Sequence, residues 1–447
     1  MNFVARLSGH GLFARALRGS VLTAGSYATA QGLRLVSNLI LTRLLYPEAF
    51  GVMALVSVAL VGLQMFSDLG LGPAIAQNPR GDDPDFLNTA FTLNVLRGAL
   101  LWLLTCALAL PLAWFYEAPD LARLLPVAGL TLLVSGFNPT RIDTANRHLV
   151  LGRLTALDLL SQVIGIAAMI VLAFALRSVW ALVLGAVLGA LAKLVLTWAF
   201  LPGPANRFRW EPAAASSLLR FGRWIFLSST CGFLLAQGDK AIFGAWLSLE
   251  ELGIYNIGFF LASFPLLLAQ AVAGRILIPL YRDHHPAESA ANAARMRRLR
   301  VLLTGGTLGL LAFLGLIGQP LVGLLYDHRY AGAAAVVVVM SCVQMPGIVG
   351  MTYDHAALAA GDSRNHFLVQ AIKTLIQTTA LLIGVAQGGL FGALAAQAVA
   401  LCLMHLPSLW LARLHRVWDP RHDVTFFTLA ALLAALVIGV NGGIWAG

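Results

Sequence analysis

Long apolar segments constrain the fold of this sequence more than any other feature. Runs of about 20 mostly apolar residues, long enough to cross a bilayer as a helix, recur thirteen times along the chain. They are too long for the strands of a membrane β-barrel. With 59% hydrophobic and 11% charged residues, the composition also excludes a soluble globular protein. We therefore predict an all-α polytopic membrane protein. The predicted spans are 20–41, 50–67, 88–112, 120–137, 155–176, 179–201, 221–247, 253–278, 299–318, 333–353, 366–386, 388–412 and 424–445.

The basic residues predict the orientation of these spans. With the N-terminus placed in the cytoplasm, twenty of the thirty basic residues fall in cytoplasmic loops and four in loops on the opposite side. This excess follows the positive-inside rule. The net charge of +10 is therefore typical of basic residues near the inner membrane face and gives no reason to expect nucleic-acid binding; contact with anionic membrane lipids is a second interpretation.

Internal sequence repeats predict two pseudo-symmetric lobes. Residues 42–55 (TRLLYPEAFGVMAL) match 244–257 (GAWLSLEELGIYNI) at an offset of 202, which aligns Gly51 with Gly253. A second repeat pairs 111–120 with 320–330. Parallel repeats of this kind are known in transporters. The predicted domains are an N-lobe of six helices (1–201), a cytoplasmic linker (202–220), a C-lobe of six helices (221–412) and an additional, thirteenth helix (424–445).

Nine basic residues fall within the bounds of the predicted spans; three of them lie within a few residues of a span start and are counted with the loops, and the other six include every lysine. A cation at the centre of a spanning helix costs ~2.5–3.5 kcal/mol, so each must meet an acid, water or an anionic ligand. We interpret four of them as the lining of a cationic cavity that binds a phosphate group: Arg34, Arg97, Lys240 and Lys373. Lys193 and Arg275 lie nearer to span ends, where ion pairing or snorkelling is the favoured interpretation, and are secondary candidates.

Other polar residues in the spans have two interpretations. Asp239, which precedes Lys240 in QGDK, is either a counter-ion to Arg34 or a group that titrates during transport, and we favour the counter-ion. Scattered glutamines and asparagines either join helices by hydrogen bonds or line a passage for sugars. The sequence shows no ligand spacing typical of a metal site.

Four stretches resemble the polysaccharide and O-antigen flippases, the Wzx-type members of the multidrug/oligosaccharidyl-lipid/polysaccharide (MOP) exporter superfamily. They are LTRLLYPEAFGVMAL after the first span, SDLGLGPAIAQ after the second, QGDKAIFGAWLSLEELGIYNIGFFLASFPLL across the seventh and eighth, and QPLVGLLYDHRYAGAA after the ninth. The resemblance covers roughly residues 18–412. The thirteenth span departs from the twelve-helix pattern of this superfamily.

The resemblance implies a V-shaped pair of lobes that works by alternating access. The implied substrate is an undecaprenyl-diphosphate-linked oligosaccharide, flipped across a bacterial inner membrane for exopolysaccharide, capsule or O-antigen synthesis. Polysaccharide polymerase and export machinery are the implied protein partners. No cofactor and no enzymatic step are needed.

Three alternatives remain. A cation-coupled multidrug exporter of the same fold predicts an acidic or aromatic cavity, whereas cations outnumber acids in these spans. A membrane enzyme predicts a large outer loop or clustered histidine and acid residues at one membrane face, and neither is visible. Charge alone does not separate a peptidoglycan precursor flippase from a polysaccharide flippase.

Overall fold

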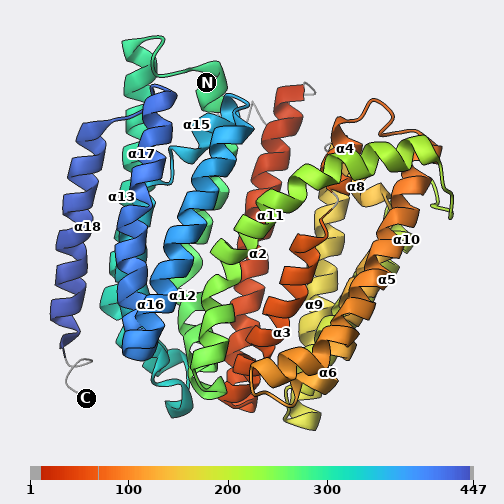
Figure 1. Cartoon of the computed structure of the whole chain (residues 1–447), viewed down its shortest axis with the longest axis horizontal. Coiled ribbons are helices and arrows are strands. Elements are labelled where there is room, and N and C mark those ends of the chain that lie inside the picture. Colours follow the sequence, from red (N-terminus) through yellow and green to blue (C-terminus); the bar gives the residue numbers. More distant parts are fainter. Residues whose placement is uncertain (1–11, 69, 149, 443–447) are drawn as a thin grey trace. The chain divides into compact units, whose positions relative to one another are not determined.

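The structure is a computed structural model that describes residues 12–68, 70–148 and 150–442, and within these ranges it is helical without β-strands (Figure 1). The first helices are α2 (Leu12–Leu44), α3 (Pro47–Phe66), α4 (Leu71–Gln77), α5 (Pro84–Phe115), α6 (Leu121–Ala128), α7 (Leu130–Gly136), α8 (Arg141–Arg147), α9 (Leu151–Leu176), α10 (Trp180–Phe200) and α11 (Pro212–Trp246). The others are α12 (Leu249–Asp283), α13 (Ala290–Leu325), the short 3-10 helix η1 (His328–Tyr330), α14 (Ala333–Gly350), α15 (Asp354–Ala359), α16 (Ser363–Leu403), α17 (His405–Leu414) and α18 (Pro420–Val440).

Local capping residues determine where several helices begin. The Ser248 side chain accepts a hydrogen bond from the backbone N–H of Glu251, whose carboxylate accepts one from the backbone N–H of Ser248, a capping box at the start of α12. Asp83 caps α5 and Asp419 caps α18, and a proline follows each of them. The starts of these helices therefore follow directly from the sequence.

The chain is a multi-pass membrane protein. Within the described residues, nine helical segments are long and apolar enough to cross a membrane, and a tenth crossing arises if 121–136 and 141–147, bent by 59°, form one broken span. The predicted spans at 20–41 and 221–247 coincide with α2 and α11, which fall outside this set. The last predicted helix, 424–445, coincides with α18 up to Val440, and residues 443–445 lie outside the described part.

Helix α16 contains two of the predicted spans. It runs for 41 residues but is broken at Gly388 and Gly389, and Gly389 has a φ of 57° that glycine adopts without steric cost. A Cβ on Gly384 would overlap Gly392, and one on Gly392 would overlap Gly384. Since a straight helix would separate these residues by about 12 Å at 1.5 Å per residue, α16 reverses direction at Gly388–Gly389. The reversal separates the predicted spans 366–386 and 388–412.

Contacts between residues divide the chain into two compact units. Unit 1 comprises 1–45 and 52–233, and unit 2 comprises 46–51 and 234–447. In unit 1, α9 packs along α10, and the two backbones come close where Gly165 meets Gly189. Helix α5 approaches α7 in the same way at Gly98 and Gly136. Small residues at such crossings let the helix backbones come close in a membrane.

The central element of unit 2 is α14, which packs against α12, α13, α16 and α18. Its apolar residues Val336, Val337, Val338 and Met340 are almost completely buried. Helix α18 lies against α13 and α14, and Figure 1 shows it at the edge of the molecule beyond α13. The additional helix is therefore a packed part of unit 2.

Candidate functional site

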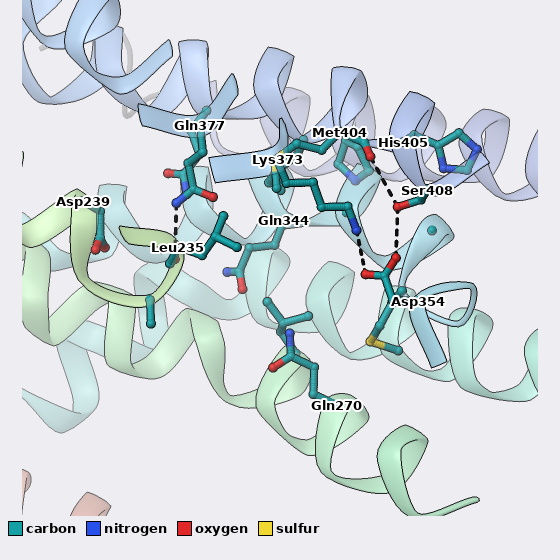
Figure 2. Close-up of a pocket in the computed structure, with 18 of the residues that line it drawn as sticks. Leu235, Asp239, Gln270, Gln344, Asp354, Lys373, Gln377, Met404, His405 and Ser408 are labelled. Carbon is teal, nitrogen blue, oxygen red and sulfur yellow. Dashed lines mark hydrogen bonds and ion pairs between the residues drawn. The ribbon is translucent and has the colours of Figure 1, made fainter. Parts of the chain in front are cut away.

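The structure contains a polar pocket within each unit. The pocket of unit 2 has a volume of about 350 Å³, in the lower part of the ~300–1,000 Å³ range of ligand sites. Helices α11, α12, α14, α16 and α17 contribute to its wall, and Figure 2 shows how their polar side chains converge. Its polar lining residues are Asp239, Gln270, Gln344, Asp354, Gln370, Lys373, Gln377, Gln397, His405 and Ser408.

Lys373, a predicted diphosphate ligand, lies in this pocket but already has a partner. Its Nζ is 2.6 Å from Oδ2 of Asp354, and both side chains are largely buried. The Ser408 hydroxyl donates to the other oxygen of Asp354 at 3.3 Å (Figure 2). The sequence interpretation missed Asp354, which follows the tenth predicted span. The available signal was a single acid in an otherwise uncharged stretch, 19 residues before Lys373.

Asp239 is 4% exposed and lines the same pocket. Its Oδ2 accepts a hydrogen bond of 2.6 Å from the hydroxyl of the fully buried Tyr255, while Oδ1 is buried without a hydrogen-bond partner. The neighbouring Lys240 does not line the pocket, and its Nζ lies 5.3 Å from the centroid of the Phe259 ring. The Tyr255 hydroxyl therefore partners the Asp239 carboxylate, and the Phe259 ring lies near the Lys240 ammonium group. The sequence interpretation had instead favoured Arg34 as the partner of Asp239 and a phosphate group as the partner of Lys240.

The pocket of unit 1 has a volume of about 360 Å³ and contains Arg97 and Lys193. Arg97 donates from Nε to the Ser67 hydroxyl at 3.1 Å and from Nη2 to the Gln64 carbonyl at 2.8 Å. Lys193 forms an ion pair with Asp158 at 2.9 Å. Arg97 forms no ion pair with any described residue, so its charge remains available to a ligand.

The two remaining candidates are Arg34 and Arg275, and Arg34 does not line either pocket. Arg34 is exposed on α2, and its guanidinium reaches the side-chain oxygen of Gln31 at 3.5 Å. Arg275 belongs to α12, but its side chain lies outside the described part of the structure. The structure therefore brings together Arg97 with Lys193, and Lys373 with Asp239.

A second polar cluster, which sequence reasoning missed, joins α18 to the wall of the unit 2 pocket. Oδ1 of Asp423 accepts a hydrogen bond of 2.6 Å from the Tyr353 hydroxyl. Its Oδ2 lies 3.2 Å from Nε2 of His405, which also lines the pocket, and accepts from Trp418 at 3.0 Å. Arg300, which is 2% exposed, lies with its guanidinium 4.6 Å from the centroid of the Tyr353 ring. Tyr353 and Arg300 lie far from Asp423 in sequence, so no local motif indicated the cluster.

Comparison with known proteins identifies the family. The model of the family described as "Polysaccharide biosynthesis protein" matches residues 40–335. The chain belongs to this family. The teichuronic acid biosynthesis protein TuaB of Bacillus subtilis is 22% identical over 78% of this chain and 72% of its own. The succinoglycan biosynthesis transport protein ExoT of Rhizobium meliloti is 24% identical over 91% of this chain and 82% of its own.

Solved structures identify the fold. The lipid II flippase MurJ in an inward closed conformation matches with a TM-score of 0.68 and 10% identity, over 95% of this chain and 98% of its own. An inward-facing multidrug resistance MATE family transporter of the MOP superfamily matches with a TM-score of 0.67 and 14% identity, over 86% and 94%. The predicted MATE/MOP-like helical fold is thereby confirmed.

Proposed function

We propose that this protein flips undecaprenyl-diphosphate-linked oligosaccharide repeat units across a bacterial inner membrane by alternating access, for the synthesis of a surface polysaccharide. The match of residues 40–335 to the polysaccharide biosynthesis family carries this proposal. The names of TuaB and ExoT connect relatives with polysaccharide synthesis and transport. The proposed step moves a substrate and makes no bond, so we propose no enzymatic activity and no cofactor.

Arg97 in the unit 1 pocket supports a binding site for the diphosphate, although two carboxylates, Asp68 and Asp143, also line this pocket. Arg97 has one guanidinium nitrogen, Nη1, for which no hydrogen bond is found among the described residues, and it forms no ion pair. An arginine fork binds phosphate oxygens through parallel charge-assisted hydrogen bonds. We assign Arg97 to the diphosphate and keep Arg34 and Lys240 as further candidate ligands. Lys193 is a weaker candidate because Asp158 already neutralises it.

Gene deletion and complementation test this function. Deletion is expected to remove one surface polysaccharide and to make its lipid-linked repeat unit accumulate inside the cell. The wild-type gene should restore the polymer. The Arg97→Ala gene should restore at least ~10-fold less polymer when the variant protein reaches the same level in the membrane. This factor corresponds to the loss of a charge-assisted contact of about 1.4 kcal/mol or more. The control is Arg282→Ala, since Arg282 is exposed and its ion pair among the described residues is with its neighbour Asp283.

Two results would contradict the proposal. Unchanged polysaccharide together with altered drug tolerance would indicate a multidrug exporter, and accumulation of the cell-wall precursor would indicate a peptidoglycan precursor flippase.

We further propose that the N-terminus and the basic segment 284–298, which includes the start of α13, face the cytoplasm, as the distribution of arginines predicts. Single cysteines introduced at residues 285 and 328, in a chain whose native cysteines are replaced, test this orientation. A membrane-impermeant thiol reagent added to intact spheroplasts should label residue 328 and spare residue 285. Labelling with the opposite pattern would reverse the topology.

A further inference from the structure

The unit 2 pocket is unusual in its supply of side-chain amides. Five glutamines from three helices line it. An amide offers two N–H donors and an acceptor oxygen and carries no net charge. Apolar side chains such as Phe259 and Leu401 complete the wall, so the pocket combines apolar surface with a few polar groups, as small-molecule sites generally do. The glutamines are Gln270, Gln344, Gln370, Gln377 and Gln397.

Three buried side-chain oxygen atoms of this pocket accept no hydrogen bond among the described residues. The amide N–H groups of Gln344 donate to the carbonyls of Ala262 and Met340, both at 3.1 Å, which leaves its Oε1 buried without a partner. Oε1 of Gln397 and Oδ1 of Asp239 are buried and unpartnered in the same way. All three of these side chains belong to residues that are at most 8% exposed. A buried acceptor left unpaired is energetically unfavourable, so the pocket fits a ligand that donates hydrogen bonds.

The charges of the pocket disfavour a phosphate ligand. Asp354 neutralises Lys373 at 2.6 Å, and Asp239 adds a second carboxylate to the lining. A phosphate group presents acceptor oxygens and negative charge, which would face these carboxylates and the unpaired amide oxygens. A sugar hydroxyl carries no charge and supplies one donor as well as acceptor lone pairs.

From these observations we infer that the unit 2 pocket is a carbohydrate subsite, which binds uncharged, hydroxyl-bearing sugar units of the substrate and not its diphosphate. In this assignment Gln344 and Gln397 accept hydrogen bonds from sugar hydroxyls, and Lys373 is a positioning residue that orients Asp354. The inference rests on the proposed function, because it names the part of the lipid-linked oligosaccharide that this pocket recognises.

Binding of two kinds of lipid to the full-length protein in nanodiscs tests the inference. The probes are undecaprenyl diphosphate and the same lipid carrying one glucose, galactose, N-acetylglucosamine or N-acetylgalactosamine. The wild type should bind at least one sugar-bearing lipid ~10-fold more tightly than the bare lipid, which corresponds to about 1.4 kcal/mol. Gln344→Leu and, separately, Gln397→Leu should reduce this preference to less than about 3-fold and leave the affinity for the bare lipid unchanged.

Two controls separate this effect from misfolding and from loss of the diphosphate site. Gln387→Leu alters an exposed glutamine that does not line the pocket and should keep the sugar preference. Arg97→Ala should weaken the binding of both kinds of lipid equally. Having two independent glutamine variants keeps the test decisive if one of them fails to fold.

Three outcomes overturn the inference. The wild type could bind all sugar-bearing lipids no better than the bare lipid, the glutamine variants could keep the preference, or they could lose both kinds of lipid together. In these cases binding of the bare lipid diphosphate leaves the flippase proposal intact. If the wild type binds neither kind of lipid, the proposed function fails together with the subsite.

Discussion

At the scale of single residues, the ion pair between Lys373 and Asp354 shows how this chain accommodates charge inside a membrane. The two side chains are 2.6 Å apart and only 10% and 19% exposed. Removing one partner of a buried pair leaves an uncompensated charge and typically lowers the stability by about 3–5 kcal/mol. Replacing both partners by uncharged groups often leaves the stability unchanged. The single and double substitutions therefore distinguish a structural ion pair from a substrate ligand.

We predict that Lys373→Met lowers the free energy of unfolding by about 3–5 kcal/mol, because the Asp354 carboxylate then lacks a counter-charge. The double variant Lys373→Met/Asp354→Asn should recover most of this loss, since the amide can still accept the hydrogen bond from Ser408. Chemical denaturation of the purified proteins in detergent, followed by tryptophan fluorescence, measures both changes. If both variants were as stable as the wild type but lost transport, Lys373 would bind substrate directly.

At the scale of elements, two closely packed helix starts consist of residues that the internal sequence repeat had aligned. A Cβ on Gly51 would overlap the Leu249 carbonyl, and a Cβ on Gly253 would overlap the Pro47 carbonyl. These four residues, all in unit 2, are related by the offset of 202, so the N-terminal turns of α3 and α12 contact each other reciprocally. The ring of Phe50 also packs edge-on against Tyr330, at 6.0 Å between centroids.

This contact predicts that an added methyl group is not tolerated at either glycine. Gly51→Ala and Gly253→Ala should each lower the midpoint of thermal unfolding, because overpacking against a backbone carbonyl costs typically 1–3 kcal/mol or more. Gly309→Ala is the matched control, since no atom lies within 4 Å of the Cβ that it adds. Thermal melts of fluorescent-protein fusions by size-exclusion chromatography measure the three variants. Equal midpoints for all three would refute the close contact.

Helix α18 is held to unit 2 by buried polar groups as well as by apolar packing. Asp423 on α18 contacts Tyr353, His405, His422 and Trp418. We predict that Asp423→Ala costs about 3–5 kcal/mol of stability, because it leaves buried donors without an acceptor. Asp283→Ala removes an acid from an exposed ion pair and should change the stability by less than about 1 kcal/mol.

Denaturation of these two variants under identical conditions checks the difference, and equal effects would mean that packing alone holds α18.

The features that could be predicted from the sequence depend on interactions between residues close together in the chain. Those that could not be predicted depend on contacts between residues far apart in the chain. Apolar runs and capping residues such as Ser248 and Asp83 act locally, so most spans and helix starts could be predicted from the sequence. The partners of Lys373 and Asp239 could not, because ion pairs and hydrogen bonds within a bundle depend on helix rotation and depth. Asp354 lies in a short helix between spans, where a carboxylate is usually solvated, and only the packed structure shows it next to Lys373.

At the scale of the whole molecule, the segment predicted as a linker is attached to unit 1. Along residues 207–211, backbone N–H groups donate to Asn88, Thr92 and Thr89 on α5. Glu211 forms an ion pair with Arg80 at 2.7 Å, and this hydrogen bonding holds the pKa of Glu211 below its usual range. The start of α11 adds Ala214, Ala215 and Leu218 to an apolar cluster with α4 and α5. Residues 207–218, here called the strap, are therefore docked on unit 1.

This docking predicts resistance to proteolysis. Arg207 and Arg209 are exposed trypsin sites, but a protease needs several residues of released backbone, and the hydrogen bonds to α5 oppose this release. Arg80→Gln, which removes the partly exposed ion pair with Glu211, should speed cleavage at these sites by roughly 2- to 5-fold. Asn88→Ala/Thr92→Ala, which removes two backbone anchors, should speed it more. Trypsin digestion of the purified protein at neutral pH, followed by mass spectrometry of the fragments, gives the rates. Arg282→Gln is the control, because it removes an ion pair within unit 2. Wild-type cleavage that is already as fast as in the variants would show that the segment moves as a free linker.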